Sequence, residues 1–247
     1  MLSLKAISRW LALVVLAFLS LQLFFVLRIA LMVVVDPEST TFQRSQIWQQ
    51  MTTDGSLHWK QEWVAYPQIS DHLKHAVVAS EDDGFVNHDG VDWNAIEKNW
   101  ERNNKLQEQA EQRLENNPKA KQRPVRIRGG STITQQLAKN LLLSGERSLL
   151  RKGQELALAM LLEQLLSKER ILEIYLNNVE WGEGVFGAQA AARRYFNKNA
   201  NQLSSAEAAR LAVMLPAPKR FEKQPQSAYL NGRTRVIMGR MNRAELP

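Results

Sequence analysis

The stretch from Glu146 to Asn178, "ERSLLRKGQELALAMLLEQLLSKERILEIYLNN", repeats apolar residues at helical spacing almost without interruption. It predicts two successive helices, over residues 149–166 and 168–177. Further helices are predicted downstream and just upstream, over residues 132–143, 188–195, 205–215 and 228–241. The chain shows no internal repeat and no alternation of strands with helices. The sequence therefore indicates a mainly α fold.

Closer to the amino terminus, the helical pattern begins after Pro67. Ser70 can cap one helix and Asp92 the next. Residues 101–128, in contrast, contain almost no large apolar side chain and are interrupted by prolines. This stretch is predicted to be a solvated helix or a mobile loop outside the core.

The amino-terminal segment over residues 10–35, "WLALVVLAFLSLQLFFVLRIALMVVV", is long enough to cross a bilayer, which takes roughly 20 apolar residues. It has no small-residue cleavage site and is followed by Asp36-Pro37, so we expect it to remain as a transmembrane anchor. Lys5 and Arg9 precede it. Residues 1–9 are therefore expected in the cytoplasm and everything after Asp36 on the far side of the membrane.

Arg28 is the one charge inside the anchor. Such a charge costs about 2.5 to 3.5 kcal/mol at the membrane centre and less towards an end, so we expect Arg28 to snorkel to the outer interface. A buried helix of a soluble core is the alternative. Residues 36–66 are expected to form a juxtamembrane segment, in short strands or at the headgroup level, and residues 67–247 the folded domain.

Composition narrows the class of partner. The net charge is +7 and the chain has no cysteine. A protein tethered to the outer face of a membrane rarely meets nucleic acid. We therefore expect its excess of Lys and Arg to bind anionic lipids and phosphate-bearing lipids. The absence of cysteine excludes disulfides, thiolate nucleophiles and cysteine-ligated metals.

The stretch over residues 79–88, "ASEDDGFVNH", sets three carboxylates side by side. A continuous helix would place Glu81, Phe85 and His88 on one face, although the glycine between them favours a turn. Burial against the phenyl ring and repulsion from the two neighbouring aspartates would both raise one carboxyl pKa, towards the value that a general base needs. An exposed and inert acidic helix end is the alternative.

A second stretch over residues 129–140, "GGSTITQQLAKN", predicts a helix whose first-turn N–H groups form an anion site. Ser131 or Thr132 can cap it. Ile133, Leu137 and Leu141 are expected to face the core. The expected polar face holds Thr132, Gln136 and Lys139, with Gln135 beside them. An ordinary amphipathic surface helix is the alternative.

In the opening stretch, Arg147, Arg151 and Glu155 follow one another at steps of four residues. They could form a solvated row of ion pairs, each contributing only a few tenths of a kcal/mol. Alternatively, Arg147 and Lys139 clamp a phosphate group, because arginine binds such oxygens in a bidentate manner and lysine as a point charge.

In this order, the segments resemble the peptidoglycan glycosyltransferases of family 51. The resemblance covers roughly residues 67–218, and five ordered motifs are far more specific than one. The matching positions are Glu81-Asp82, Phe85, His88 and Gly90; Gly130-Ser131-Thr132, Gln135-Gln136 and Lys139-Asn140; Arg151-Lys152 and Glu155; Tyr175, Asn177, Gly182, Gly184, Gly187 and Ala191; and the stretch 203–218.

The resemblance implies a lysozyme-like helical lobe plus a smaller membrane-proximal lobe. It implies polymerisation of lipid II onto a growing glycan strand, with inversion at the sugar and release of polyprenyl diphosphate. Glu81 is the expected general base. Glu155 is expected to orient cations or to hold Mg²⁺ or Mn²⁺ on the diphosphate, with no protein-only metal site. The residues expected to bind substrate are Asp82, Phe85, His88, Ser131, Thr132, Gln135, Gln136, Lys139, Arg147, Arg151 and Lys152.

Two other functions fit the same residues. A lysozyme-like lobe with two glutamates could hydrolyse glycans, and a tethered scaffold could keep the motifs for fold alone. The expected location is the bacterial inner membrane, with a single span and a periplasmic catalytic domain. The expected partners are lipid II, the growing strand, membrane lipids and other cell-wall synthesis proteins, without nucleic acid.

Overall fold

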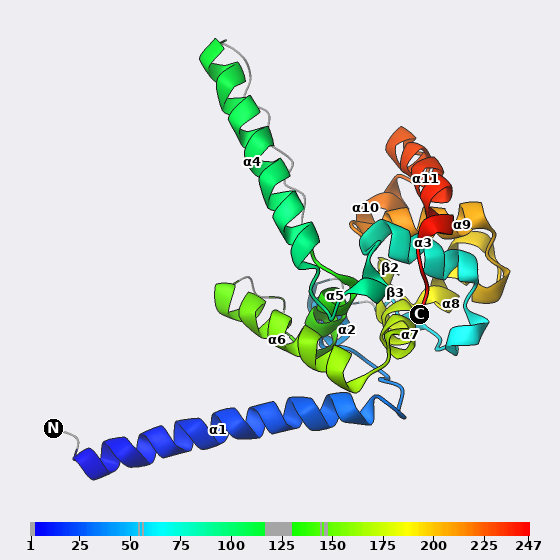
Figure 1. Cartoon of the computed structure of the whole chain (residues 1–247). Helices are drawn as coiled ribbons and strands as arrows, with labels where there is room; N and C mark the ends of the chain where they lie inside the picture. Colours follow the sequence, from blue (N-terminus) through cyan, green and yellow to red (C-terminus); the bar gives the residue numbers. More distant parts are fainter. Residues whose placement is uncertain (1–2, 54, 56, 117–129, 144, 146–147) are drawn as a thin grey trace.

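The computed structural model describes residues 3–247 except 54, 56, 117–129, 144 and 146–147. Helices dominate, which confirms the mainly α fold, and one long helix extends from the folded part at the amino terminus (Figure 1). This helix, α1 (Leu4–Leu31), is long and apolar enough to cross a membrane. It begins before Trp10 because Ser3 caps it, and it ends before Val35 because the chain turns from Met32 onward.

The juxtamembrane segment contains a helix that the sequence did not indicate, α2 (Thr41–Thr53), followed by the short strand β1 (Lys60–Gln61). The helix was missed because its apolar residues follow no helical period. β1 pairs in parallel with β3 (Val185–Phe186), and β3 pairs antiparallel with β2 (Glu180–Gly182). These strands are too short to show an alternating pattern in the sequence.

The larger lobe packs α3 (Asp71–Glu81) on α9 (Ser205–Met214) and α11 (Ala228–Arg240), with α8 (Ala188–Phe196) and α10 (Pro218–Lys223) beside them. The smaller lobe, next to α1, packs α5 (Ile133–Leu142) on α6 (Leu149–Leu165) and α2. Helix α7 (Lys168–Asn178) contacts α5, α6 and α8, and so joins the two lobes. This division agrees with the two lobes implied by the family resemblance.

Local signals in the sequence were mostly correct. Asp92 Oδ1 accepts from Ala95 N at 2.8 Å, as expected of a cap, and in the later part of the chain Ser204 forms a capping box with Glu207. Ser70, however, does not cap α3, because its hydroxyl donates to the Leu203 carbonyl at 3.1 Å. Pro218 begins α10, a position where its missing N–H has no consequence.

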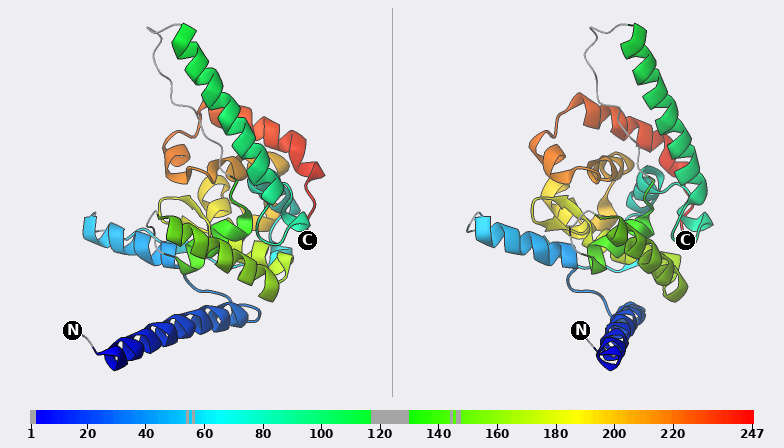
Figure 2. Two further views of the ribbon diagram at one scale, coloured as in Figure 1. Left: turned by 60° about the vertical axis from the view of Figure 1, so that its left-hand side comes forward. Right: turned by 90° about the vertical axis from the view of Figure 1, so that its left-hand side faces the viewer.

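Helix α4 (Trp93–Asn116) projects away from both lobes (Figures 1 and 2). Its side chains are mostly exposed, so the predicted solvated helix is confirmed as far as Asn116. The remainder of the polar stretch lies outside the described residues.

Candidate active site

The acid of the first motif lies where α3 ends. The buried apolar face of α3, which includes Leu73 and Val77, fixes the helix in the larger lobe and leaves Glu81 as its last residue. Burial raises the pKa of Glu81 and the charge of Asp82 adds to this, while hydrogen bonds from Gln136 and Ser80 act in the opposite direction. The predicted direction of this pKa shift is confirmed. Asp83, in contrast, is exposed and pairs with Arg240 at 3.4 Å.

A chain of two hydrogen bonds reaches Glu81 from two other helices. The Nε2 of Gln136, on α5, donates to Glu81 Oε2 at 3.0 Å, and the hydroxyl of Tyr175, on α7, donates to Gln136 Oε1 at 3.0 Å. The tyrosine therefore fixes which end of the amide faces the acid. Tyr175 is buried, and burial together with the charges of Glu81 and Asp82 raises its pKa well above the ordinary value. It stays a neutral donor.

Asp82 has its own contacts in the core. Its Oδ1 lies 2.9 Å from His88 Nε2, and its Oδ2 accepts from Ile133 N at 2.9 Å. The amide of Ile133 is one of the open N–H groups of α5. The predicted anion site at this helix end is therefore wrong in part, because a carboxylate of the protein takes up one of its donors.

Thr132, not Ser131, caps α5: its Oγ1 accepts from Gln135 N at 3.1 Å. The same hydroxyl donates to the carbonyl of Gly90 at 2.6 Å. Gly90 has φ +83°, and a Cβ there would lie 3.0 Å from the Ala159 carbonyl oxygen, so only glycine fits between this loop and α6. The loop that carries the acids is thus fixed to both helices.

Two residues that the sequence did not single out, Lys168 at the start of α7 and Glu163 on α6, also hold this loop in place. Lys168 Nζ donates to the carbonyl of His88 at 2.5 Å and pairs with Glu163 at 2.8 Å. It also lies 4.6 Å from the centre of the Phe85 ring. Phe85 is fully buried, so it packs in the core. No sequence pattern marks the contact of Lys168 with the acid-bearing loop, because His88 is 80 positions away in the chain.

The second acid, Glu155, lies on α6 and is 3% exposed. It accepts from Arg151 Nη1 at 3.1 Å and from Lys152 Nζ at 2.5 Å. Lys152 also reaches Ser131 Oγ at 3.3 Å, and so joins α6 to the start of α5. The interpretation as a solvated row of ion pairs is wrong for Glu155, because its carboxylate is buried. Arg147 lies outside the described residues.

The polar face predicted for α5 is only partly correct. Ile133, Leu137 and Leu141 are buried as expected, and Lys139 is exposed. Thr132 and Gln135, however, are also buried, at 2% and 1% exposure. Gln136 and Lys139 are therefore the members of this set that can face a substrate.

Among the residues that the structure describes, the site offers no ready set of metal ligands. The described residues contain no group of three or more His, Asp or Glu side chains able to hold an ion. Both carboxylate oxygens of Glu155 already accept from cations. This donor set suits the orienting role expected for Glu155 and does not fit a metal bound by the protein alone.

A cavity of about 790 Å³ opens between the start of α4 and α6. His88 lines this cavity from the loop that follows α3, Glu163 lines it from α6, and Trp93 lines it from α4. Its described lining includes neither Glu81 nor Glu155, so we do not place the reaction there.

A carboxyl with a raised pKa, set in a helical fold with one apolar amino-terminal helix long enough to cross a membrane, fits the class of helical enzymes that work at a membrane. Within this class, the sequence profile of the Transglycosylase family matches residues 48–242, and the chain belongs to this family. It is 49% identical to the biosynthetic peptidoglycan transglycosylase of Paraburkholderia phytofirmans over 97% of this chain and 94% of the relative. It is also similar to proteins of the same name from Herminiimonas arsenicoxydans (48% identity, 99% of both chains) and Bordetella pertussis (51%, 86% and 82%).

Proposed function

We propose that the chain, a glycosyltransferase of peptidoglycan synthesis, polymerises lipid II into linear glycan strands and that Glu81 is its general base. One observation carries the assignment of the base. Glu81 is a carboxyl with a pKa raised by burial, and its accompanying donor, Gln136, is held in place by Tyr175. A base with such a pKa can take a proton near neutral pH and is regenerated easily.

The proposed step forms one glycosidic bond between the growing strand and lipid II. Glu81 takes the proton of the acceptor's 4-hydroxyl while that oxygen attacks C1 of the donor sugar on the growing strand. The bond from C1 to the diphosphate oxygen breaks with its electron pair, so polyprenyl diphosphate leaves and C1 inverts from α to β. The hydrogen bond from Gln136 holds the carboxylate in one orientation for this proton transfer.

The leaving diphosphate gains negative charge, so cations directed at it stabilise the transition state more than the ground state. Lys139 is exposed on α5, and Arg151 and Lys152 are held by the buried carboxylate of Glu155. We assign these three cations to the diphosphate and Glu155 to their orientation. Because the protein lacks a fitting ligand set among its described residues, we propose that any divalent cation binds through the phosphate oxygens of the substrate.

The proposed setting is the outer face of the bacterial inner membrane. Lys5 and Arg9 lie at the start of α1, which favours a cytoplasmic amino terminus. Leu149 and Leu150 begin α6 at 92% and 88% exposure, next to the cations of the Glu155 cluster. Exposed leucines beside basic groups suit contact with anionic lipid. Association with other cell-wall synthesis proteins stays a prediction.

Chain formation from purified lipid II, with and without divalent cation, tests this function. We expect glycan strands and free polyprenyl diphosphate, and no shortening of added glycan that lacks crosslinks. Shortened glycan would favour the hydrolase, whose chemistry has no diphosphate for the cations to hold. A folded protein that produces neither reaction would favour the scaffold.

A further inference from the structure

The carboxyl-terminal end of the anchor helix α1 is bound to α5, the helix that carries Gln136. Arg28 Nη2 donates to the carbonyl of Leu141 at 3.3 Å, and Thr41 Oγ1 donates to the same oxygen at 2.9 Å. Leu141 lies in the last turn of α5, where a helix leaves its carbonyls without intrahelical partners. Arg28 therefore does not simply extend to the outer interface, as the sequence suggested. It caps a helix of the catalytic domain, and a cation is favourable at such a C-terminus.

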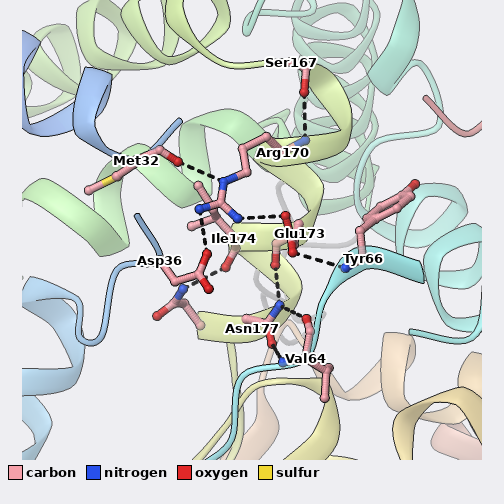
Figure 3. A network of polar contacts seen from close by, with 10 residues as sticks. Met32, Asp36, Val64, Tyr66, Ser167, Arg170, Glu173, Ile174 and Asn177 are labelled. Carbon is pink, nitrogen blue, oxygen red and sulfur yellow. Dashed lines mark hydrogen bonds and ion pairs between the residues drawn. The ribbon is translucent and has the colours of Figure 1, made fainter. Parts of the chain in front are cut away.

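A second clamp binds the same end of the anchor to the helix that carries Tyr175. Arg170, on α7, donates through Nε to the Met32 carbonyl at 2.8 Å and pairs with Asp36 at 2.7 Å (Figure 3). Its remaining terminal nitrogen pairs with Glu173 at 2.8 Å, on the same helix. One guanidinium thus joins α7 to the chain on both sides of the turn that ends the anchor.

Apolar contacts make this joint part of the core. Phe25, Ile29 and Met32 are buried, at 6%, 0% and 4% exposure, and belong to the main hydrophobic cluster, although α1 is mostly exposed before Phe25. Helix α1 packs on α6 at this end. The last turns of the anchor therefore belong to the catalytic domain.

The two clamped helices are the ones that supply the partners of Glu81. On α5, Leu141 lies at the opposite end from the turn that holds Gln136, and on α7, Arg170 precedes Tyr175. We propose that Arg28 and Arg170 are positioning residues, through which the anchor sets α5 and α7 so that Tyr175 and Gln136 meet at Glu81. This inference rests on the proposed function of Glu81. It also explains why a charge stands within the apolar stretch over residues 10–35.

Substitution of Arg28 separates anchoring from positioning. Arg28→Leu makes α1 more apolar, so the variant should stay in the membrane at least as firmly as the wild type. We expect its kcat on lipid II to fall about 10-fold, within the roughly 100-fold loss that a misplacement of about 1 Å can cause. KM should change less than 2-fold, on the order expected when positioning and not substrate binding is lost. Arg28→Lys keeps the charge and one donor and should restore part of the rate.

The pH profile distinguishes positioning from a general loss of structure. The titratable groups that face Glu81 are Asp82 and Tyr175, and the variants change neither. If α5 shifts, the hydrogen bond from Gln136 to Glu81 weakens. Because this bond lowers the pKa of Glu81, the acidic limb of kcat should move to higher pH.

The experiment uses the full chain in liposomes, with Leu27→Ala as the matched control, because Leu27 neighbours Arg28 and is 60% exposed. Arg170→Gln should reproduce the changes in rate and pH profile seen with Arg28→Leu. A wild-type rate for Arg28→Leu, or a lower rate with an unchanged pH profile, would overturn the proposal. Failure of the wild-type protein to polymerise lipid II would instead overturn the proposed function.

Discussion

Removing one hydroxyl tests the hydrogen-bond chain that ends at the base. Tyr175→Phe deletes the donor that lies 3.0 Å from Gln136 Oε1 and changes little else in volume. The side-chain amide of Gln136 then has no partner that fixes its orientation. It can rotate, so that its Nε2 donates to Glu81 only part of the time. We expect the protein to fold, because the ring stays in its buried site.

The size of the effect follows from the contacts. Hydrogen bonds to charged groups contribute about 1.5–3 kcal/mol, and a buried acceptor left without a donor costs about 1–3 kcal/mol. The Gln136 amide still donates to Glu81 part of the time. We therefore expect the stabilisation of the transition state to fall by about 1–2 kcal/mol. This corresponds to a roughly 5- to 30-fold lower kcat. Removal of the base itself should cost more, about 100- to 10,000-fold.

The assay is the initial rate of glycan formation from lipid II over a range of pH. Because the bond from Gln136 lowers the pKa of Glu81, weakening this bond raises that pKa, and the acidic limb of kcat should move to higher pH. Tyr195→Phe is the matched control, since Tyr195 donates to the Trp181 carbonyl at 2.8 Å in the larger lobe. A Tyr175→Phe enzyme with the rate and pH profile of this control would refute the reasoning.

Further predictions concern the two acids and the exposed lysine. Glu155→Gln should lower the unfolding free energy on the order of 2 kcal/mol, mostly through Arg151, because Lys152 is 42% exposed and solvent screens its pair; an unchanged denaturation midpoint would contradict this. Lys139→Ala should keep its melting temperature and lose turnover on the order of 100-fold, whereas full turnover would make that helix face an ordinary surface. Burial raises the pKa of Glu81, so its ionisation destabilises the fold as pH rises above the ordinary value. Glu81→Gln should therefore melt at a higher temperature than the wild type at neutral pH but not at acidic pH, and an equal difference at both would argue against the buried charge.

The helices of the fold could be predicted because each buries an apolar stripe that local spacing reveals. The segments over 149–166 and 168–177 agree with α6 and α7 within a residue at each end. Helix α2 and the strands β2 and β3 could not be predicted, because their place depends on contacts with distant segments. β1 lies in the juxtamembrane segment, where short strands were one of the two expectations. Gln43 Nε2, for example, binds the Asn178 carbonyl at 3.3 Å.

The site could be predicted in residue type but not in arrangement. The family motifs assigned Glu81 and Gln136 to one site without predicting their contact, and the raised pKa of the acid was expected from its neighbours. The role of Tyr175 was not visible, because its hydroxyl meets Gln136 from a third helix. Likewise, the pairing of Arg28 with the end of α5 could not be read from a segment that local hydropathy assigns to lipid.

The most direct test of the central claim is the rate of lipid II polymerisation by Glu81→Gln in the full-length, membrane-inserted protein. The account predicts a folded protein whose rate is lower than that of the wild type by a factor of about 100 to 10,000 across the whole pH range, because the amide cannot accept the proton. A rate close to that of the wild type, with an acidic limb at the same pH, would contradict the assignment of Glu81 as the base.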